Sequence, residues 1–125
     1  MLKVFVVDDE YELGVSIKDY LESIGNIKVY TFDNALTVLM EVESQKPDLI
    51  LLDILMSGLD GLSLLSRIKS SNHNEVKVIM VTAMKKDDVA IKAEDLGADD
   101  YLEKPIDFKS LESLIRKHVP EAVLK

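Results

Sequence analysis

Short runs of apolar residues alternate along the chain with longer segments whose apolar residues recur every three or four positions. One run, 49–52, consists of four large apolar residues and leads directly into Asp53 and the turn-forming segment 57–61. A continuous apolar run of this length, bounded by turn signals, predicts a strand that is buried on both faces. The expected strands are 4–7, 27–32, 49–52, 76–81 and 101–102.

The segments between these runs show the spacing of amphipathic helices. The first helix stops at Gly25, the second is capped by 33–34 and the third by Asp60. The fourth covers 86–96 and is closed by Gly97. The expected inward residues of the last helix are Phe108, Leu111, Leu114, Ile115 and Val119.

Strands that alternate with single helices predict right-handed crossovers and a parallel sheet with helices on both faces. The run 27–32 contains Lys28 and Thr31, and the run 101–102 is short, so both are expected at the edges of the sheet. With these two runs at the edges and the more apolar runs in the middle, the favoured strand order is 2-1-3-4-5. The expected fold is a single α/β domain that covers 1–125.

Composition narrows the class of protein. The 125 residues are 47% hydrophobic and 30% charged, as in a soluble globular domain. The net charge of −8 argues against nucleic acid as a direct partner. The absence of cysteine excludes disulfides and thiolate metal sites. With no bilayer-length apolar run and no signal-peptide pattern at the start, we expect a cytoplasmic protein without membrane contact.

Polar residues that could carry chemistry stand at the carboxyl ends of the expected strands. They are 8–10, Asp53, Thr82 and Lys104. Because these ends share one edge of a parallel sheet, the side chains should converge. Clustered carboxylates repel one another unless a cation joins them, and an oxygen-only set suits Mg²⁺.

The same residues supply the parts of a phosphoryl transfer. A carboxylate such as Asp53 can act as the nucleophile and form an acyl phosphate. Asp8 and Asp9 would hold Mg²⁺, while Thr82 and Lys104 would hold the phosphoryl oxygens.

Simpler interpretations exist for single residues. Asp9 taken alone is more readily explained as a helix N-cap, and Asp60 as a cap rather than a ligand. Tyr101 could simply pack in an edge strand. His73 and His118 are expected at the surface, with no zinc site.

Four motifs together give a family resemblance that covers essentially the whole chain. The chain resembles the receiver domain of two-component response regulators, whose small free-standing example is the chemotaxis response regulator. The resemblance implies a flavodoxin-like (βα)5 fold. The motifs are Val6-Val7-Asp8-Asp9-Glu10, Leu51-Leu52-Asp53-Ile54-Leu55-Met56 followed by Asp60-Gly61, Val81-Thr82-Ala83, and Gly97-Ala98-Asp99-Asp100-Tyr101-Leu102 with Lys104-Pro105.

The resemblance implies that Asp53 accepts a phosphoryl group from a sensor histidine kinase, a phosphotransfer protein or a small acyl phosphate. Mg²⁺, with Mn²⁺ as an alternative, would be bound by the Asp9 and Asp53 carboxylates and the Leu55 carbonyl, and by Asp8 through water. Lys104 would pair with the phosphoryl group. The chain would be no enzyme beyond its own phosphorylation and autodephosphorylation.

The resemblance also implies a switch. Thr82 would move toward the phosphoryl group, Tyr101 would rotate from exposed to buried, and the Lys104–Pro105 peptide would be cis. The surface of the fourth helix, fifth strand and fifth helix would then recruit a downstream protein, act on a C-terminal output domain or form a homodimer. Ile91, expected to be exposed on the fourth helix, is a candidate contact.

Three residues bear on loop rigidity and phosphoryl lifetime. Ser57 stands where the family often has proline, which should loosen the loop after the acceptor. Leu55 and Met84 occupy the two positions that modulate autodephosphorylation in the family. Both are apolar and cannot orient an attacking water, so we expect a long-lived phosphoryl-aspartate.

Three other functions remain open. An FMN carrier on the same fold would need a phosphate-binding loop after the first strand, where this chain has the acids 8–10. A haloacid-dehalogenase-type phosphatase would need an Asp-x-Asp pattern there and a larger chain. A phosphorylation-independent interaction domain would not need the complete set of Asp53, Thr82 and Lys104.

Overall fold

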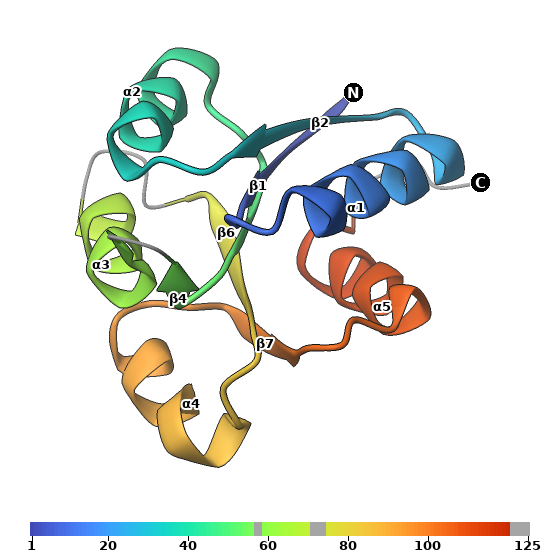
Figure 1. Cartoon of the computed structure of the whole chain (residues 1–125). Helices are drawn as coiled ribbons and strands as arrows, with labels where there is room; N and C mark the ends of the chain where they lie inside the picture. The colour runs from blue at the N-terminus through green and yellow to red at the C-terminus, as the bar shows by residue number, and fades with distance from the viewer. Residues whose placement is uncertain (57–58, 71–74, 121–125) are drawn as a thin grey trace.

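The computed structural model describes residues 1–56, 59–70 and 75–120, so Ser57 and His73 lie outside the described residues. The strands are β1 (Leu2–Val7), β2 (Ile27–Phe32), β3 (Leu49–Leu52), β4 (Leu55–Met56), β5 (Leu59–Asp60), β6 (Lys77–Thr82) and β7 (Asp100–Glu103) (Figure 1). The helices are α1 (Tyr11–Ile24), α2 (Ala35–Gln45), α3 (Gly61–Ser70), α4 (Lys86–Asp95) and α5 (Phe108–His118).

Five strands form one parallel sheet in the order β2-β1-β3-β6-β7. The predicted 2-1-3-4-5 order is therefore confirmed, with the two least apolar runs at the edges. The register aligns the carboxyl ends of the strands, because Val7 lies opposite both Phe32 and Leu52. The residues that follow the strands consequently meet along one edge of the sheet.

The sheet separates two hydrophobic layers, with α1 and α5 on one face and α2, α3 and α4 on the other (Figure 1). Successive residues of a strand point to opposite faces. In β1, Val4 and Val6 belong to the layer under α1 and α5, whereas Phe5 and Val7 belong to the layer under the other three helices. This double burial explains why the central strands are continuous apolar runs.

The bounds of several elements differ from the predicted ones: β1 begins at Leu2, β7 covers Asp100–Glu103 and α4 ends at Asp95. The fourth predicted strand is displaced by one residue, so Thr82 is the last residue of β6 instead of following it. In addition, β4 and β5 form a small antiparallel pair in which Leu55 lies opposite Asp60. The sequence indicates only a turn there, because two-residue strands leave no periodic pattern.

Helix caps mostly follow the sequence. The Asn34 side chain accepts hydrogen bonds at the start of α2, and Asp60 Oδ1 accepts from the Leu62 N–H at 3.0 Å. Gly97 follows α4 with a φ of 104°, as expected of a closing glycine. The N-cap of α1 is Glu10 and not Asp9, so the capping interpretation of Asp9 is wrong.

The sequence predicts exposed positions for both Ile91 and His118, and only the first prediction is correct. Ile91 is 75% exposed. The His118 side chain is 14% exposed, and its Nε2 lies 2.8 Å from Asp100 Oδ2. Burial alone would raise the pKa of Asp100, but hydrogen bonds from His118 and the Tyr101 N–H lower it. The sequence around His118 gives no sign of this contact, because its partner Asp100 lies in another element, β7.

The outer edge of β2 is covered by side chains of α1. Glu22 Oε2 accepts a hydrogen bond from the Val29 N–H at 2.9 Å, and Lys18 Nζ donates to the Val29 carbonyl at 3.1 Å. Lys18 and Glu22 also form an ion pair with each other. These contacts satisfy backbone groups that an edge strand would otherwise present to solvent.

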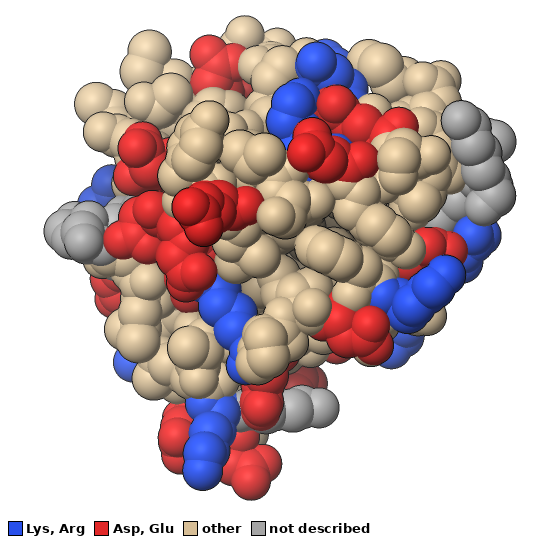
Figure 2. Space-filling model, turned by 45° about the vertical axis from the view of Figure 1, so that its right-hand side comes forward, with Lys and Arg blue, Asp and Glu red and all other residues tan. Residues whose placement is uncertain are grey.

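Many charged side chains form mixed groups on the surface. On the face shown in Figure 2, acidic side chains gather in several patches, and basic side chains lie beside some of them. None of the helices in the described part of the chain has the length and apolar character needed to cross a membrane.

Candidate functional site

The backbone places three of the predicted site residues by continuing the hydrogen-bond ladders of the sheet. The Asp8 N–H donates to the Phe32 carbonyl at 3.0 Å, and the Asp53 N–H donates to the Val7 carbonyl at 3.0 Å. The Lys104 N–H donates to the Thr82 carbonyl at 2.8 Å. Each residue is therefore held as an extension of its strand, and the predicted convergence at the carboxyl edge is present.

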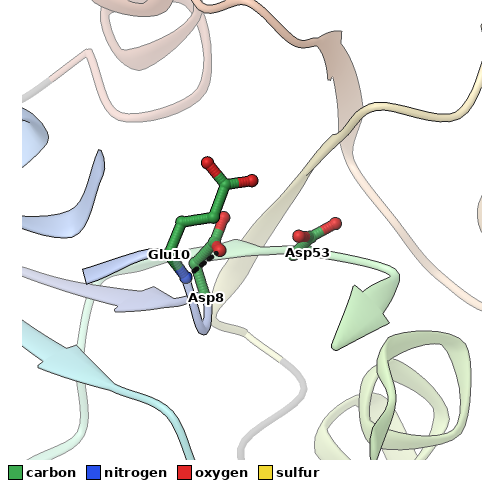
Figure 3. Close-up of side chains that lie close together, drawn as sticks. All are labelled: Asp8, Glu10 and Asp53. Carbon is green, nitrogen blue, oxygen red and sulfur yellow. Dashed lines mark hydrogen bonds between the residues drawn. The ribbon is translucent and has the colours of Figure 1, made fainter. Parts of the chain in front are cut away.

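A group of three carboxylates forms at this edge. Ligand atoms of Asp8, Glu10 and Asp53 all lie within 4.8 Å of one another. Figure 3 shows that Asp8 and Glu10 follow β1, while Asp53 follows β3 across from them. The Asp8 and Asp53 side chains are only 4% and 5% exposed, so mutual repulsion is poorly screened.

Lys104 compensates this negative charge. Its Nζ lies 2.7 Å from Glu10 Oε1, 2.8 Å from Asp8 Oδ2 and 3.0 Å from Asp53 Oδ2. Burial alone would lower the pKa of the ammonium, but the contacts with the three carboxylates outweigh burial and raise it. Lys104 is consequently a permanent cation in this site.

Asp8 retains a proton more readily than an ordinary aspartate. Burial is the main cause that raises its pKa, and the nearby Asp53 charge adds to it. The Lys104 ammonium and the Glu10 N–H, which donates to Asp8 Oδ1 at 2.8 Å, act in the opposite direction. A further cation near Asp8 would favour its charged form.

The donor set fits a hard divalent cation. All of its ligand atoms are carboxylate oxygens, and two of the carboxylates are nearly buried, which is the chemistry that Mg²⁺ takes in proteins. Of the predicted ligands, the structure brings Asp8 and Asp53 together. Asp9 is exposed and lines a neighbouring hollow of about 240 Å³ with Asp8 and Glu10. The Leu55 N–H lies 3.3 Å from Asp53 Oδ1, so Leu55 adjoins the acceptor.

Glu10 is the member of the site for which the sequence predicts no role of its own. It follows the two predicted acids directly, and this adjacency is the signal that could have identified it. Its contact with Lys104 spans 94 positions of the chain. Spacing within one strand end cannot reveal that partner.

Thr82, Met84 and Tyr101 form a chain of hydrogen bonds beside the acids. Thr82 is fully buried, and its Oγ1 lies 3.4 Å from the Met84 N–H. The Tyr101 hydroxyl donates to the Met84 carbonyl at 2.7 Å. Burial and the nearby charges of Glu103 and Asp53 raise the pKa of Tyr101 to about 12. Tyr101 is thus half-buried and joined to the Thr82 segment in this structure.

Comparison with known proteins places this geometry in a family. The model of the response regulator receiver domain matches residues 4–116. Sporulation initiation phosphotransferase F of Bacillus subtilis is 30% identical over 118 residues, which are 94% of this chain and 94% of that protein. The DNA-binding transcriptional regulator NtrC of Escherichia coli is 38% identical over 116 residues, which are 93% of this chain and 24% of NtrC.

Solved structures of response regulators resemble this fold closely. A two-component response regulator from Clostridium difficile superposes with a TM-score of 0.88 at 26% identity, over 96% of this chain and 97% of that one. The receiver domain of NtrX from Brucella abortus gives a TM-score of 0.85 at 31% identity, over 94% of this chain and 98% of that one. With its parallel five-stranded sheet and its acids opposite a lysine, the chain belongs to the response regulator receiver domain family of two-component systems.

Proposed function

We propose that Asp53 accepts a phosphoryl group from the phosphohistidine of a sensor kinase or phosphotransfer protein, or from a small acyl phosphate. One Asp53 carboxylate oxygen attacks the phosphorus atom, the bond from phosphorus to the donor breaks, and the donor leaves with the bonding electrons. The observation that carries the proposal is the nearly buried Asp53 carboxylate, 3.0 Å from the Lys104 ammonium at the carboxyl edge of a parallel sheet.

The neighbouring residues have distinct roles in this reaction. Lys104 and the buried hydroxyl of Thr82 bind oxygens of the transferred group and stabilise their charge. Asp8, Asp9, Asp53 and the Leu55 carbonyl would hold Mg²⁺. The metal ion supplies charge neutralisation for the phosphoryl oxygens.

The output of the reaction is a change of surface. Binding of Thr82 Oγ1 to the phosphoryl group would compete with its contact to the Met84 N–H, and the Met84 carbonyl is the acceptor of Tyr101. Phosphorylation would thereby shift the conformational equilibrium of the face formed by α4, β7 and α5, where Ile91 is exposed. The partner is a downstream protein, an output domain or a second copy of the chain.

The first test replaces the acceptor. After incubation with acetyl phosphate and Mg²⁺, the intact mass of the wild-type protein should show one added phosphoryl group. Asp53→Asn should show none, because an amide is not a nucleophile for this reaction. Asp19→Asn, an exposed aspartate of α1, serves as the matched control and should be labelled like the wild type. Equal labelling of Asp53→Asn, or labelling that persists in EDTA, would contradict the proposal.

The phosphoryl group should be long-lived once formed. Leu55 is 61% exposed beside the acceptor and Met84 is half-buried, and neither side chain can orient a water molecule. The double variant Leu55→Asn with Met84→Glu should shorten the half-life by about tenfold, because a positioned polar group assists the attack of water. Decay is followed by intact mass after removal of the donor. Leu36→Asn, at an equally exposed apolar position of α2, should leave the half-life unchanged.

A further inference from the structure

Glu10 differs from the other carboxylates that contact Lys104. Its side chain is 60% exposed, whereas those of Asp8 and Asp53 are nearly buried, yet its contact of 2.7 Å is the shortest of the three. We propose that Glu10 binds the solvent side of the Lys104 ammonium while Asp53 is unmodified, and that an incoming phosphoryl group must displace it. This inference rests on the proposed function and makes Glu10 a positioning residue that slows phosphorylation.

The donor capacity of Lys104 supports this role. An ammonium group has three N–H donors and no acceptor. Glu10 and Asp53 accept hydrogen bonds from Nζ, and the Asp8 carboxylate forms an ion pair with it at 2.8 Å. An anion that reaches Lys104 from solvent therefore finds its donors already engaged and has to take the place of one acceptor.

Exposure decides which acceptor leaves. Asp8 would lose its ion pair while remaining nearly buried, which is costly for a charged group. Glu10 can turn into water, where its carboxylate is fully solvated. Its ligand atom also lies within 4.8 Å of Asp53, so a phosphoryl group on Asp53 would repel it. Glu10 is consequently the carboxylate that gives way.

The contact and the charge of Glu10 can be separated by two substitutions. Glu10→Gln removes the charge. Glu10→Asp keeps the charge but is one methylene shorter, and its backbone stays fixed by the hydrogen bond from the residue 10 N–H to Asp8 Oδ1. Glu12 is an exposed glutamate in the first turn of α1, directly after the N-cap residue Glu10, and Glu12→Gln is therefore the matched control for charge.

The first measurement is the rate of phosphorylation by acetyl phosphate at saturating Mg²⁺, with the Mg²⁺ affinity of each variant determined separately. Glu10→Asp, which is too short to keep the contact, should react about fivefold faster than the wild type, the factor that corresponds to one lost hydrogen bond of about 1 kcal/mol. Glu10→Gln, whose amide oxygen is a neutral and therefore weaker acceptor for the ammonium, should also react faster. Glu12→Gln should react at the wild-type rate. Mg²⁺ affinity should be unchanged in all three variants.

Three outcomes would overturn the inference. Acceleration in Glu10→Gln alone would mean that Glu10 acts through its charge and not through the contact. Wild-type rates in both variants would mean that Lys104 is not obstructed. Slower reaction together with weaker Mg²⁺ binding would make Glu10 a metal ligand instead.

A second measurement needs no phosphodonor and therefore separates this inference from the proposed function. In ¹⁵N-labelled protein, exchange of the Lys104 ammonium protons with water reports their hydrogen bonds, and Lys104→Met identifies the signal. Exchange should be slow in the wild type and Glu12→Gln, and faster in both Glu10 variants. If the wild type accepts no phosphoryl group, the proposed function fails, while this exchange pattern still decides whether Glu10 holds the ammonium.

Discussion

Replacement of Gly61 by alanine should lower the free energy of unfolding by about 3 kcal/mol or more and abolish phosphorylation of Asp53. A Cβ atom at residue 61 would lie 2.0 Å from the Asp53 carbonyl oxygen and 2.7 Å from the Ile54 Cα. Both obstacles are backbone atoms, which cannot rotate away as a flexible side chain could. The variant must therefore move either the acceptor segment or the start of α3.

Each of these movements has a cost that the structure makes explicit. The Gly61 N–H donates to the Ile54 carbonyl at 2.9 Å, and this hydrogen bond ties α3 to the acceptor segment. Directly after it, Leu62, Leu64 and Leu65 of α3 are buried in the hydrophobic layer. Moving the helix start disturbs this packing, while moving the acceptor segment displaces Asp53 from Lys104.

Urea unfolding and the intact-mass assay measure the two effects of Gly61→Ala separately. Gly14→Ala is the matched control, because its Cβ would meet the Thr31 side chain at ordinary contact distances, 3.4 Å from Cγ2 and 3.8 Å from Cβ. Inside α1 that substitution should be neutral or stabilising by about 0.5 kcal/mol. A Gly61→Ala protein with wild-type stability and normal labelling would show that the close approach is not required.

Lys104→Met should destabilise the protein by about 3 kcal/mol at neutral pH, because it leaves two nearly buried carboxylates without their cation. The side chains of Lys104, Asp8 and Asp53 are at most 11% exposed, so solvent screens the loss weakly. If Mg²⁺ binds the acids as proposed, adding it should recover part of the stability, because a divalent ion restores positive charge.

The pH dependence of Lys104→Met has a defined sign. In the wild type, burial and Asp53 already raise the pKa of Asp8 against the opposing effect of Lys104. Without the ammonium, this pKa should rise further. The loss of stability caused by Lys104→Met should therefore be largest at neutral pH. It should shrink as the pH falls through the pKa that Asp8 has in the folded variant.

Chemical unfolding at several pH values, with Mg²⁺ and with EDTA, measures the Lys104→Met effect. Lys92→Met, at an exposed position of α4, should change stability by less than about 0.5 kcal/mol. If Lys104→Met lost no more stability than this control, the ion pairs of Lys104 would only offset the cost of their own desolvation.

The fold and the convergence of three site residues could be predicted because they depend on burial and on strand direction. The run 49–52 is apolar at every position since β3 is covered on both faces, and this pattern identified the strand and its terminal acid. The convergence of Asp53 with Asp8 and Lys104 followed from parallel strand direction alone. Strand direction is a property of the whole sheet, so it can be inferred without side-chain geometry.

Features that depend on one side chain reaching a distant partner were missed. The contact of Glu10 with Lys104 depends on a flexible side chain, and that of His118 with Asp100 joins α5 to β7. The polar spacing that predicts an exposed helix face is the same with or without these contacts. The exact position of Thr82 was missed by one residue, because strand ends are set by the neighbouring ladder as well as by apolar pattern.

The cover that α1 provides over the edge of β2 has a consequence for association. A foreign strand could extend the sheet at Val29 only after displacing Glu22 and Lys18 from its backbone groups and separating their ion pair. The helix that directly precedes this strand in the chain thus protects it against aggregation as soon as both have formed. The contacts proposed above with a kinase and a downstream protein would then be made through side-chain surfaces, while strand exchange at Val29 would first have to displace these two side chains.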